Sequence, residues 1–365
     1  MDAKLLSLAA CGSNPGGEPA PGTETNSGAA PSSAPAGEKA VNIGITTDPQ
    51  VVNPPNDNNG TAFEISKIMF IPLMDISEDL EFVPALAREV TTEDNITFTI
   101  RLQEGIKWSD GEDVTADDTI FTLNLITNPQ VGSTVASYLN CIQGTESTGW
   151  MPEGTSALEG VAKVDDYTLT VTCKEPVADS TFLSNVAYRL RTVPEHVLKD
   201  VPLENVLQSD FALSPTVGNG AFLFQEYVSG QHVSLTANPN YYKGAPKLAR
   251  LNLVILSATQ VATQLETGEI DMAYPGSVES GDYDGLLALS HIRSLEGDPV
   301  SVRNLIINNQ KVDNVQARQA MNLAVDRALI VDRMMGGYAN IQATIVTPAS
   351  KYYGMFAGLE LWDVA

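Results

Sequence analysis

The string IKWSDGEDVTADD at residues 106–118 constrains the fold more than any other part of the sequence. It follows a segment in which apolar and polar residues alternate, the pattern of a half-buried strand; the apolar members are Ile96, Phe98, Ile100 and Leu102. Ser-Asp-Gly at 109–111 is typical of a tight turn, because glycine readily takes a positive φ. Thr115, followed by acidic Asp118, predicts a helix start. The string therefore predicts a strand, a turn and a helix in that order.

The same string resembles the signature of the family 5 solute-binding proteins of ABC transporters, the oligopeptide-binding type. That signature reads lysine, aromatic, any residue, Asp-Gly and, after a short gap, Thr-Ala-x-Asp. Four further segments resemble motifs of the family and follow in the family's order: 80–87, 217–222 with 238–244, 267–271, and 308–327. Tyr242 stands where the family often has Trp, and Asn219 where Thr is commoner. One such match could arise by chance, but five in order indicate membership.

The resemblance implies an α/β fold of the type II periplasmic-binding-protein kind, with two lobes and an extra β-rich subdomain on the first. Residues 1–40 would be a signal remnant and linker. Residues 41–74 and 180–300 would form lobe I, and 75–179 the β-rich subdomain. Residues 301–365 would hold the hinge strand, at 302–309, and the start of lobe II. Family members continue beyond this length, so we expect a C-terminally truncated chain with an incomplete second lobe.

Periodicity predicts further elements. Short strands are expected at 41–45, 233–236 and 251–255, and a hairpin at 161–164 and 167–173. Helices are expected near 63–73 and 260–267, the latter with Val261 and Leu265 facing inward. The strongest helical pattern begins at Asp313, which has capping-box spacing with Gln316, and ends before Gly336-Gly337.

The chain has 365 residues and a formal net charge of −24, and its length suits two domains. A charge this negative argues against nucleic-acid binding, because no basic surface is available to displace the counterions of the phosphates. It favours cationic substrates weakly. An acidic, well-solvated surface that keeps the protein soluble is the simpler interpretation.

The N-terminus resembles a bacterial lipoprotein leader. Small residues precede a cysteine in LAAC at 8–11, which places lipidation on Cys11; a chance occurrence is the alternative. The apolar run 5–10 is shorter than the usual ~7–15 residues of a leader. Residues 12–40 are rich in Gly, Pro and Ser and predict a disordered tether. No other segment approaches the ~18 apolar residues of a membrane span. We therefore expect an extracytoplasmic protein anchored on the outer face of the bacterial cell membrane, or a periplasmic one.

Two cysteines remain once Cys11 is set aside. Cys141 and Cys173 form an even pair in an extracytoplasmic setting and could form a disulfide. Two free thiols are the alternative.

No catalytic motif emerges from the sequence. It contains no G-x-S-x-G and no P-loop. His196, His232 and His291 are isolated from one another and lack metal-ligand spacing. Gly218-Asn219-Gly220 is better interpreted as a structural turn than as a phosphate loop. We expect no enzyme activity, no metal and no cofactor.

The resemblance implies three ligand-binding loops. Peptide-type ligands are held by strand-like main-chain hydrogen bonds, so exposed backbone matters more than side-chain identity. The matching residues here are Asn58, Asn59, Gly60 and Thr61, then Tyr274, Pro275 and Gly276, and finally Pro299. An ordinary turn is the alternative for each. Other motif residues are expected to be structural: Trp108, Asp271, Asn308, Arg318 and Asp326.

The function implied is that of the substrate-binding lipoprotein of an ABC importer. It would close two lobes on an oligopeptide or similar small solute and dock on the permease subunits, without making or breaking a bond. An oligosaccharide or signalling-peptide receptor of the same fold is one alternative. A surface hydrolase that uses acidic residues is another, from a different class.

Overall fold

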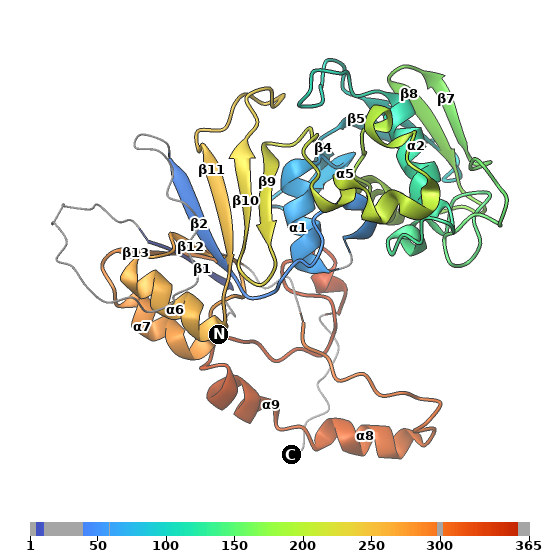
Figure 1. Ribbon diagram of the computed structural model, residues 1–365. Helices are drawn as coiled ribbons and strands as arrows, with labels where there is room; N and C mark the ends of the chain where they lie inside the picture. Colours follow the sequence, from blue (N-terminus) through green and yellow to red (C-terminus); the bar gives the residue numbers. More distant parts are fainter. Residues whose placement is uncertain (1–4, 11–38, 58, 298–301, 357–365) are drawn as a thin grey trace, which may run out of the picture. The chain divides into compact units, whose positions relative to one another are not determined.

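The computed structural model describes residues 5–10, 39–57, 59–297 and 302–356. The chain divides into two compact units (Figure 1). Unit 1 comprises residues 1–24, 42–46 and 256–365, and unit 2 comprises residues 25–41 and 47–255. The predicted boundaries at 74/75, 179/180 and 300/301 differ from this division and stay a prediction. Residues 11–38, which hold Cys11 and nearly all of the predicted tether, lie outside the described residues.

Unit 1 contains strands in the order β13-β1-β12-β2. β1 (Leu5–Ala10) runs antiparallel to β13 (Ile292–Gly297) and to β12 (Met272–Ala273). β12 runs parallel to β2 (Ala40–Ile45), as predicted for the first strand. The stretch expected to belong to a leader is therefore a paired strand here.

Helix α6 (Ala258–Thr267) matches the helix predicted near residues 260–267. Its Val261 and Leu265 are fully buried. Ser257 and Gln260 form a capping box at its start, and Gly268 ends it in the left-handed conformation at φ 77°. A short 3-10 turn, η5 (Ser280–Asp282), and helix α7 (Tyr283–Leu287) follow.

The last described part of unit 1 departs from two predictions. Residues 302–308 form no strand: Leu305 and Ile306 are 73% and 88% exposed, and no neighbouring backbone among the described residues pairs with them. Helix α8 (Val315–Leu323) is capped by Asn314, which accepts from the Ala317 N–H at 3.1 Å, and not by Asp313. Asparagine directly before the first helical residue is the better cap because its side-chain oxygen reaches that amide.

The long helix predicted to begin at Asp313 is divided into separate helical segments. The chain leaves α8 after Leu323 and re-enters helical structure in α9 (Arg327–Leu329) and η6 (Ile330–Met334). None of the residues of these elements is buried. Gly336 and Gly337, at φ 57° and 83°, end this segment as predicted, and a turn of 3-10 helix follows at η7 (Tyr353–Phe356).

Unit 2 contains an antiparallel set of strands, β9 (Phe222–Val228), β10 (His232–Ala237) and β11 (Arg250–Ile255). Helix α1 (Gly60–Met69) packs against β9. The turn at 218–220, just before β9, is hydrogen-bonded to the chain that follows α1: the Asn219 side chain accepts from the Ile71 N–H at 2.8 Å. A Cβ at Gly220 would lie 2.1 Å from the Ile68 carbonyl oxygen, so the predicted structural turn is confirmed.

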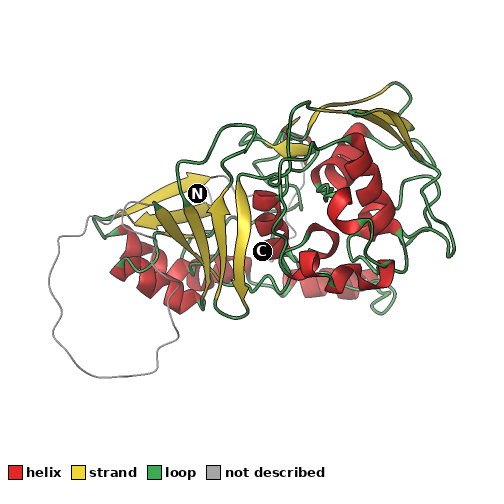
Figure 2. Ribbon diagram, turned by 45° about the horizontal axis from the view of Figure 1, so that its top comes forward, coloured by secondary structure: helices red, strands yellow, loops and turns green. Residues whose placement is uncertain are grey.

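A second sheet in unit 2 has the order β5-β6-β8-β7. Figure 2 draws the strands in yellow and the helices in red. The strands are β5 (Ala87–Thr92), β6 (Thr97–Leu102), β7 (Val161–Asp165) and β8 (Thr168–Thr172). Helix α2 (Ala116–Thr127) packs on β7 and β8, and Phe98 stacks on Phe182 with ring centroids 3.8 Å apart. The predicted strand and hairpin are confirmed.

Shorter elements connect these strands. Two are strands, β3 (Met74–Ile76) and β4 (Phe82–Pro84), which pair antiparallel. The remainder are short helical segments: η1 (Pro54–Asn56), η2 (Ala136–Leu139), α3 (Asp179–Phe182), η3 (Leu183–Tyr188), α4 (Glu195–Leu198), η4 (Leu203–Gln208) and α5 (Asp210–Leu213).

The 106–118 string folds as its local chemistry predicts. Trp108 is fully buried, and Gly111 takes φ 101° in the turn. Thr115 and Asp118 form a capping box at the start of α2. The apolar residues of the string therefore lie in the core, while its turn at residues 109–113 remains at the surface.

Candidate functional site

A pocket of about 470 Å³ opens in unit 2 between the start of α1 and the η2 turn. Two predicted ligand-binding residues, Asn59 and Gly60, line it. Thr61 follows them in α1 but does not line it, and Asn58 lies outside the described residues. The other lining residues are Asp57, Phe63, Glu64, Thr134, Val135, Ser137, Tyr138, Tyr188 and Arg189.

The loop before α1 is fixed at both ends. The Asn59 side chain accepts from the Ala62 N–H at 2.9 Å and so caps the helix, while its amide donates to the Pro49 carbonyl at 2.9 Å. Two consecutive prolines, Pro54 and Pro55, restrict the backbone just upstream. These contacts fix Asn59 at the start of α1 and the Pro54–Pro55 turn upstream of it.

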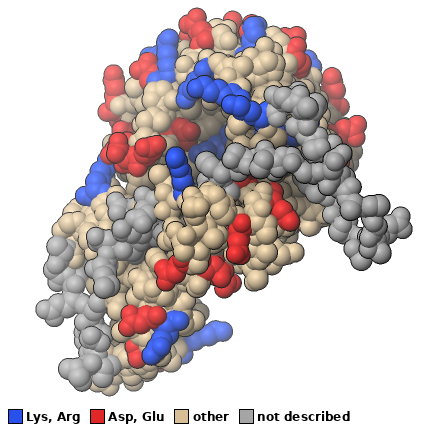
Figure 3. Space-filling view, turned by 90° about the vertical axis from the view of Figure 1, so that its left-hand side faces the viewer, with Lys and Arg blue, Asp and Glu red and all other residues tan. Residues whose placement is uncertain are grey.

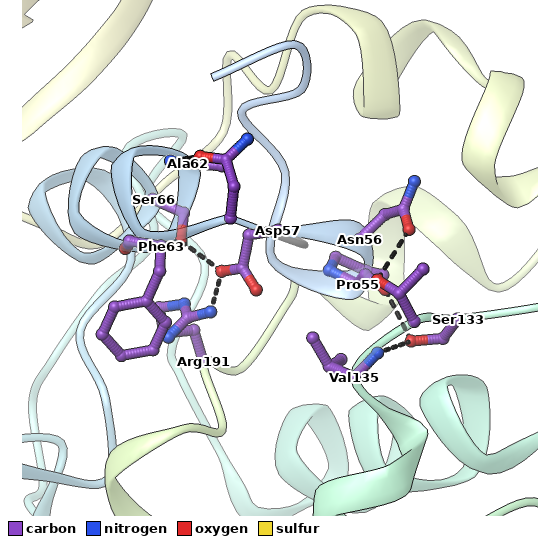
Figure 4. Close-up of polar contacts among 11 residues, drawn as sticks. Pro55, Asn56, Asp57, Ala62, Phe63, Ser66, Ser133, Val135 and Arg191 are labelled. Atoms are coloured by element: carbon purple, nitrogen blue, oxygen red, sulfur yellow. Dashed lines mark hydrogen bonds and ion pairs between the residues drawn. The ribbon is translucent and has the colours of Figure 1, made fainter. Parts of the chain in front are cut away.

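The facing loop is tied to the same segment (Figure 4). The Ser133 hydroxyl donates to the Pro55 carbonyl at 2.6 Å, and the Thr134 hydroxyl donates to the Asn56 side chain at 2.9 Å. These bonds join residues 78 positions apart in the sequence. The two sides of the pocket are thus held together by polar contacts below it.

A buried ion pair supports the floor of the pocket. The Arg191 guanidinium donates to the Asp57 carboxylate, which also accepts from the Ser66 hydroxyl at 2.7 Å (Figure 4). Both side chains are about 1% exposed or less. Burial lowers the pKa of Arg191 to about 9, so its guanidinium remains protonated at neutral pH beside the carboxylate. The second Asp57 oxygen and two Arg191 nitrogens have no hydrogen-bond partner among the described residues.

Aromatic and cationic side chains line the mouth of the pocket. The Arg189 guanidinium lies 4.8 Å from the Phe63 ring centroid and 4.3 Å from that of Tyr138. Tyr188 packs on Phe63 at 5.4 Å, and burial raises the pKa of its hydroxyl. The sequence analysis missed these four residues, because they come from three separate segments and share no motif.

The second predicted loop lies in unit 1, in a turn after β12. The Tyr274 N–H donates to the Gly44 carbonyl at 2.9 Å, the Ser277 N–H donates to the Tyr274 carbonyl at 2.9 Å, and Gly276 takes φ 81°. Tyr274, Pro275 and Gly276 do not line the unit 2 pocket. The third predicted contact, Pro299, lies outside the described residues.

The comparison with known protein families is decisive. Residues 81–357 match the model of the bacterial extracellular solute-binding proteins, family 5. The chain belongs to this family. The prediction made from the five ordered motifs is confirmed, and so is the two-lobe α/β fold class that the family carries.

Relatives of this chain with curated names include peptide-binding proteins. A Brucella ovis protein, whose name describes it as an ABC transporter peptide-binding protein, is 32% identical over 276 residues, covering 74% of this chain and 48% of the relative. The oligopeptide-binding protein AppA of Bacillus subtilis is 24% identical over 316 residues, covering 85% of this chain and 54% of the relative. The chain spans about half the length of these curated relatives.

Solved structures of family 5 proteins share the fold. AppA from Bacillus subtilis, in complex with a nonapeptide, superposes with a TM-score of 0.71 at 21% identity, over 90% of this chain and 62% of that chain. CtaP from Listeria monocytogenes, an ABC transporter substrate-binding protein, gives 0.69 at 26% identity, over 90% and 63%.

Cys141 and Cys173 are free thiols joined by a hydrogen bond. The Lys174 N–H donates to the Cys141 carbonyl at 2.9 Å, and Ile142 forms an isolated bridge with Cys173. A hydrogen bond between the thiols lowers the pKa of Cys141 and raises that of Cys173. The disulfide stays a prediction.

The three histidines, all in the part of the chain that the structure describes, are not gathered into a metal site. Within the described ranges, no group of three or more His, Cys, Asp or Glu side chains could hold a metal ion, and no helix is long and apolar enough to cross a membrane. His196 pairs with Asp110, and His232 with Glu226. Acidic and basic side chains are interspersed on the face in Figure 3.

Proposed function

We propose that this chain is the substrate-binding lipoprotein of an ABC importer and captures oligopeptides or similar small solutes. The observation that carries the proposal is its membership of the family 5 solute-binding proteins, together with relatives named for peptide binding. In this role the protein retains its ligand intact and delivers it to the permease subunits of the importer. It makes and breaks no bond.

The unit 2 pocket is proposed as part of the solute-binding surface. It is lined by Asn59 and Gly60, for which the motif resemblance implies ligand binding. Hydrogen bonds cap α1 at Asn59 and join the two segments on either side of the pocket. A preformed pocket lowers the entropy that binding costs. Aromatic rings and exposed backbone suit a ligand that is held by main-chain contacts and varied side chains.

Further contacts are proposed for the predicted loops outside the pocket. Asn58 precedes Asn59 in the sequence and Thr61 lies in the first turn of α1, while Tyr274, Pro275, Gly276 and Pro299 would contribute from other segments. Lipidation at Cys11 would hold the protein at the outer face of the cell membrane. The 12–40 tether would then let the receptor sample solvent near its permease.

The proposal is tested with a pool of synthetic peptides and a pool of oligosaccharides. Each pool is incubated with the purified full chain, and the bound fraction is identified by native mass spectrometry after removal of free ligand. We expect intact peptides to be retained. Retention of oligosaccharides alone would indicate the alternative receptor, and release of cleaved products would indicate a hydrolase.

A pair of variants locates the binding surface. Ser137→Trp places an indole in the pocket mouth, where Ser137 is exposed. Ser184→Trp makes the same change at an exposed position of η3 outside the pocket. We expect the first variant to reduce peptide retention at least about tenfold, since a blocked pocket loses more than ~1.4 kcal/mol of binding free energy. Equal retention by both variants would place the ligand elsewhere.

A further inference from the structure

Arg189 is the one side chain of the unit 2 pocket whose charge has no counter-charge in contact among the described residues. Its guanidinium is half-buried over the Phe63 and Tyr138 rings, at 4.8 and 4.3 Å. No carboxylate of the described chain lies within ion-pair distance of it. The cation–π contacts hold the guanidinium in place and leave its charge available to an anion.

The other charges at the pocket are already paired. Asp57 lines the pocket, but its side chain is buried and neutralised by Arg191. Glu64 lies 3.9 Å from Lys67, which also binds Asp75 at 3.0 Å. These side chains carry three negative and two positive charges, so Arg189 brings the set to neutrality and is its one cation without a carboxylate in contact among the described residues.

The geometry of Arg189 suits a planar anion. Stacking on Phe63 and Tyr138 occupies the faces of the guanidinium and restricts its rotation. The N–H groups at its edge remain available, and their fork matches the two oxygens of a carboxylate. Arg189 is half-buried, so a charge-assisted hydrogen bond there is less weakened by water than one at an exposed position.

We infer that Arg189 binds a carboxylate of the solute, as the specificity-determining residue of the pocket. The inference rests on the proposed function, since it names the chemical group that the receptor selects. In a peptide the carboxylate is either an acidic side chain or the free C-terminus. Glu64 also lines the pocket, but its carboxylate lies 3.9 Å from Lys67 and does not contact Arg189, so it does not occupy the proposed carboxylate position.

The test measures preferences within matched peptide pairs. One series differs only by Glu against Gln at an internal position, and another only by a free against an amidated C-terminus. Affinities for the full chain are measured by isothermal titration calorimetry. We expect the carboxylate form of one pair to bind about tenfold more tightly than its neutral partner, and the pair that shows this identifies the source of the carboxylate.

Three variants separate recognition from a structural role. Arg189→Gln should bring the acid-to-amide affinity ratio close to one, and Arg189→Lys should retain part of it, because lysine keeps the charge but lacks the fork. Arg88→Gln makes the same charge change at an exposed position on β5 and should leave the ratio at its wild-type value.

The outcomes distinguish this inference from the proposed function. Peptides that bind wild type with equal affinity in acid and amide forms would overturn the inference alone. So would a ratio that persists in Arg189→Gln, which would assign Arg189 a packing role. Failure of every peptide to bind wild type would overturn the proposed function and this inference with it.

Discussion

At the scale of single residues, the Asp57–Arg191 pair shows how much a buried charge depends on its partner. Arg191→Met keeps the length of the side chain but leaves Asp57 buried and uncompensated. We expect the free energy of unfolding to fall by about 3–5 kcal/mol. Urea denaturation measures this, with Arg88→Met as the surface control.

The double variant Asp57→Leu/Arg191→Met tests the explanation. Both charges are then replaced by apolar groups, so much of the lost stability should return. A double variant that is no more stable than Arg191→Met would show that packing, and not the unpaired charge, causes the loss.

Cys141 and Cys173 lead to a second residue-scale prediction. With glutathione disulfide as oxidant, both thiols lose their hydrogen atoms, the S–S bond forms, and the oxidant is reduced to two thiols. Cys141 should attack first, since its pKa is lowered by the hydrogen bond from Cys173. We expect oxidation to raise the free energy of unfolding by about 3–4 kcal/mol.

Mass spectrometry detects the loss of two hydrogen atoms on oxidation, and urea denaturation gives the stability. Cys141→Ser serves as the control, because it cannot form the bond. Oxidised and reduced wild type with the same midpoint of unfolding would contradict the prediction.

Asp48 predicts a pH dependence. Burial raises its pKa, but hydrogen bonds from the Tyr227 hydroxyl and from the Gln50 and Gly230 N–H groups outweigh this, so the net pKa is lowered. A lowered folded pKa contributes stability above the unfolded value of 3.8, and that stability is lost as pH falls through the folded pKa.

Asp48→Asn should therefore be less stable than wild type by about 1 kcal/mol at neutral pH. The difference should shrink as the pH falls below the unfolded pKa. Unfolding in urea at several pH values measures it, with exposed Asp79→Asn as the control. A difference that does not depend on pH would mean that the carboxylate charge is not the cause.

At the scale of elements, the turn between α1 and β9 depends on the small size of glycine. Gly220→Ala would place a methyl group 2.1 Å from the Ile68 carbonyl oxygen, which the backbone cannot accommodate without moving. We expect a loss of about 2–4 kcal/mol in the free energy of unfolding. Gly60→Ala, in the first turn of α1 with nothing within 4 Å of the new methyl, should be neutral or stabilising.

Elements were predictable where the local pattern and the tertiary environment agree. The strand at Phe98–Leu102, the Thr115 cap and the inward Val261 and Leu265 follow from period and capping alone. The 302–308 segment was wrongly predicted as a strand, because pairing requires a neighbour that sequence cannot supply. Of the residues that line the pocket, only Asn59 and Gly60 were predicted from the sequence. Tyr138 and Arg189 come from separate segments and reach the pocket only through the tertiary fold.

At the scale of the whole molecule, unit 2 has its own core and should fold without unit 1. A fragment of residues 39–255 keeps both sheets of unit 2 and buried side chains such as Trp108 and Phe182. We expect it to unfold in one cooperative transition. Urea denaturation followed by tryptophan fluorescence and circular dichroism measures this, with a fragment of residues 116–255, which lacks β5, β6 and Trp108, as the control.

The position of β1 has a consequence for maturation. Its backbone bonds join β13 and β12, yet its six residues are the ones a signal peptidase would remove with the leader. Processing before Cys11 would thus withdraw a strand from the middle of the pairing order and expose two new edges. If the proposed processing before Cys11 takes place, the mature protein would lack β1, and the vacant position between β13 and β12 would be open to another extended segment.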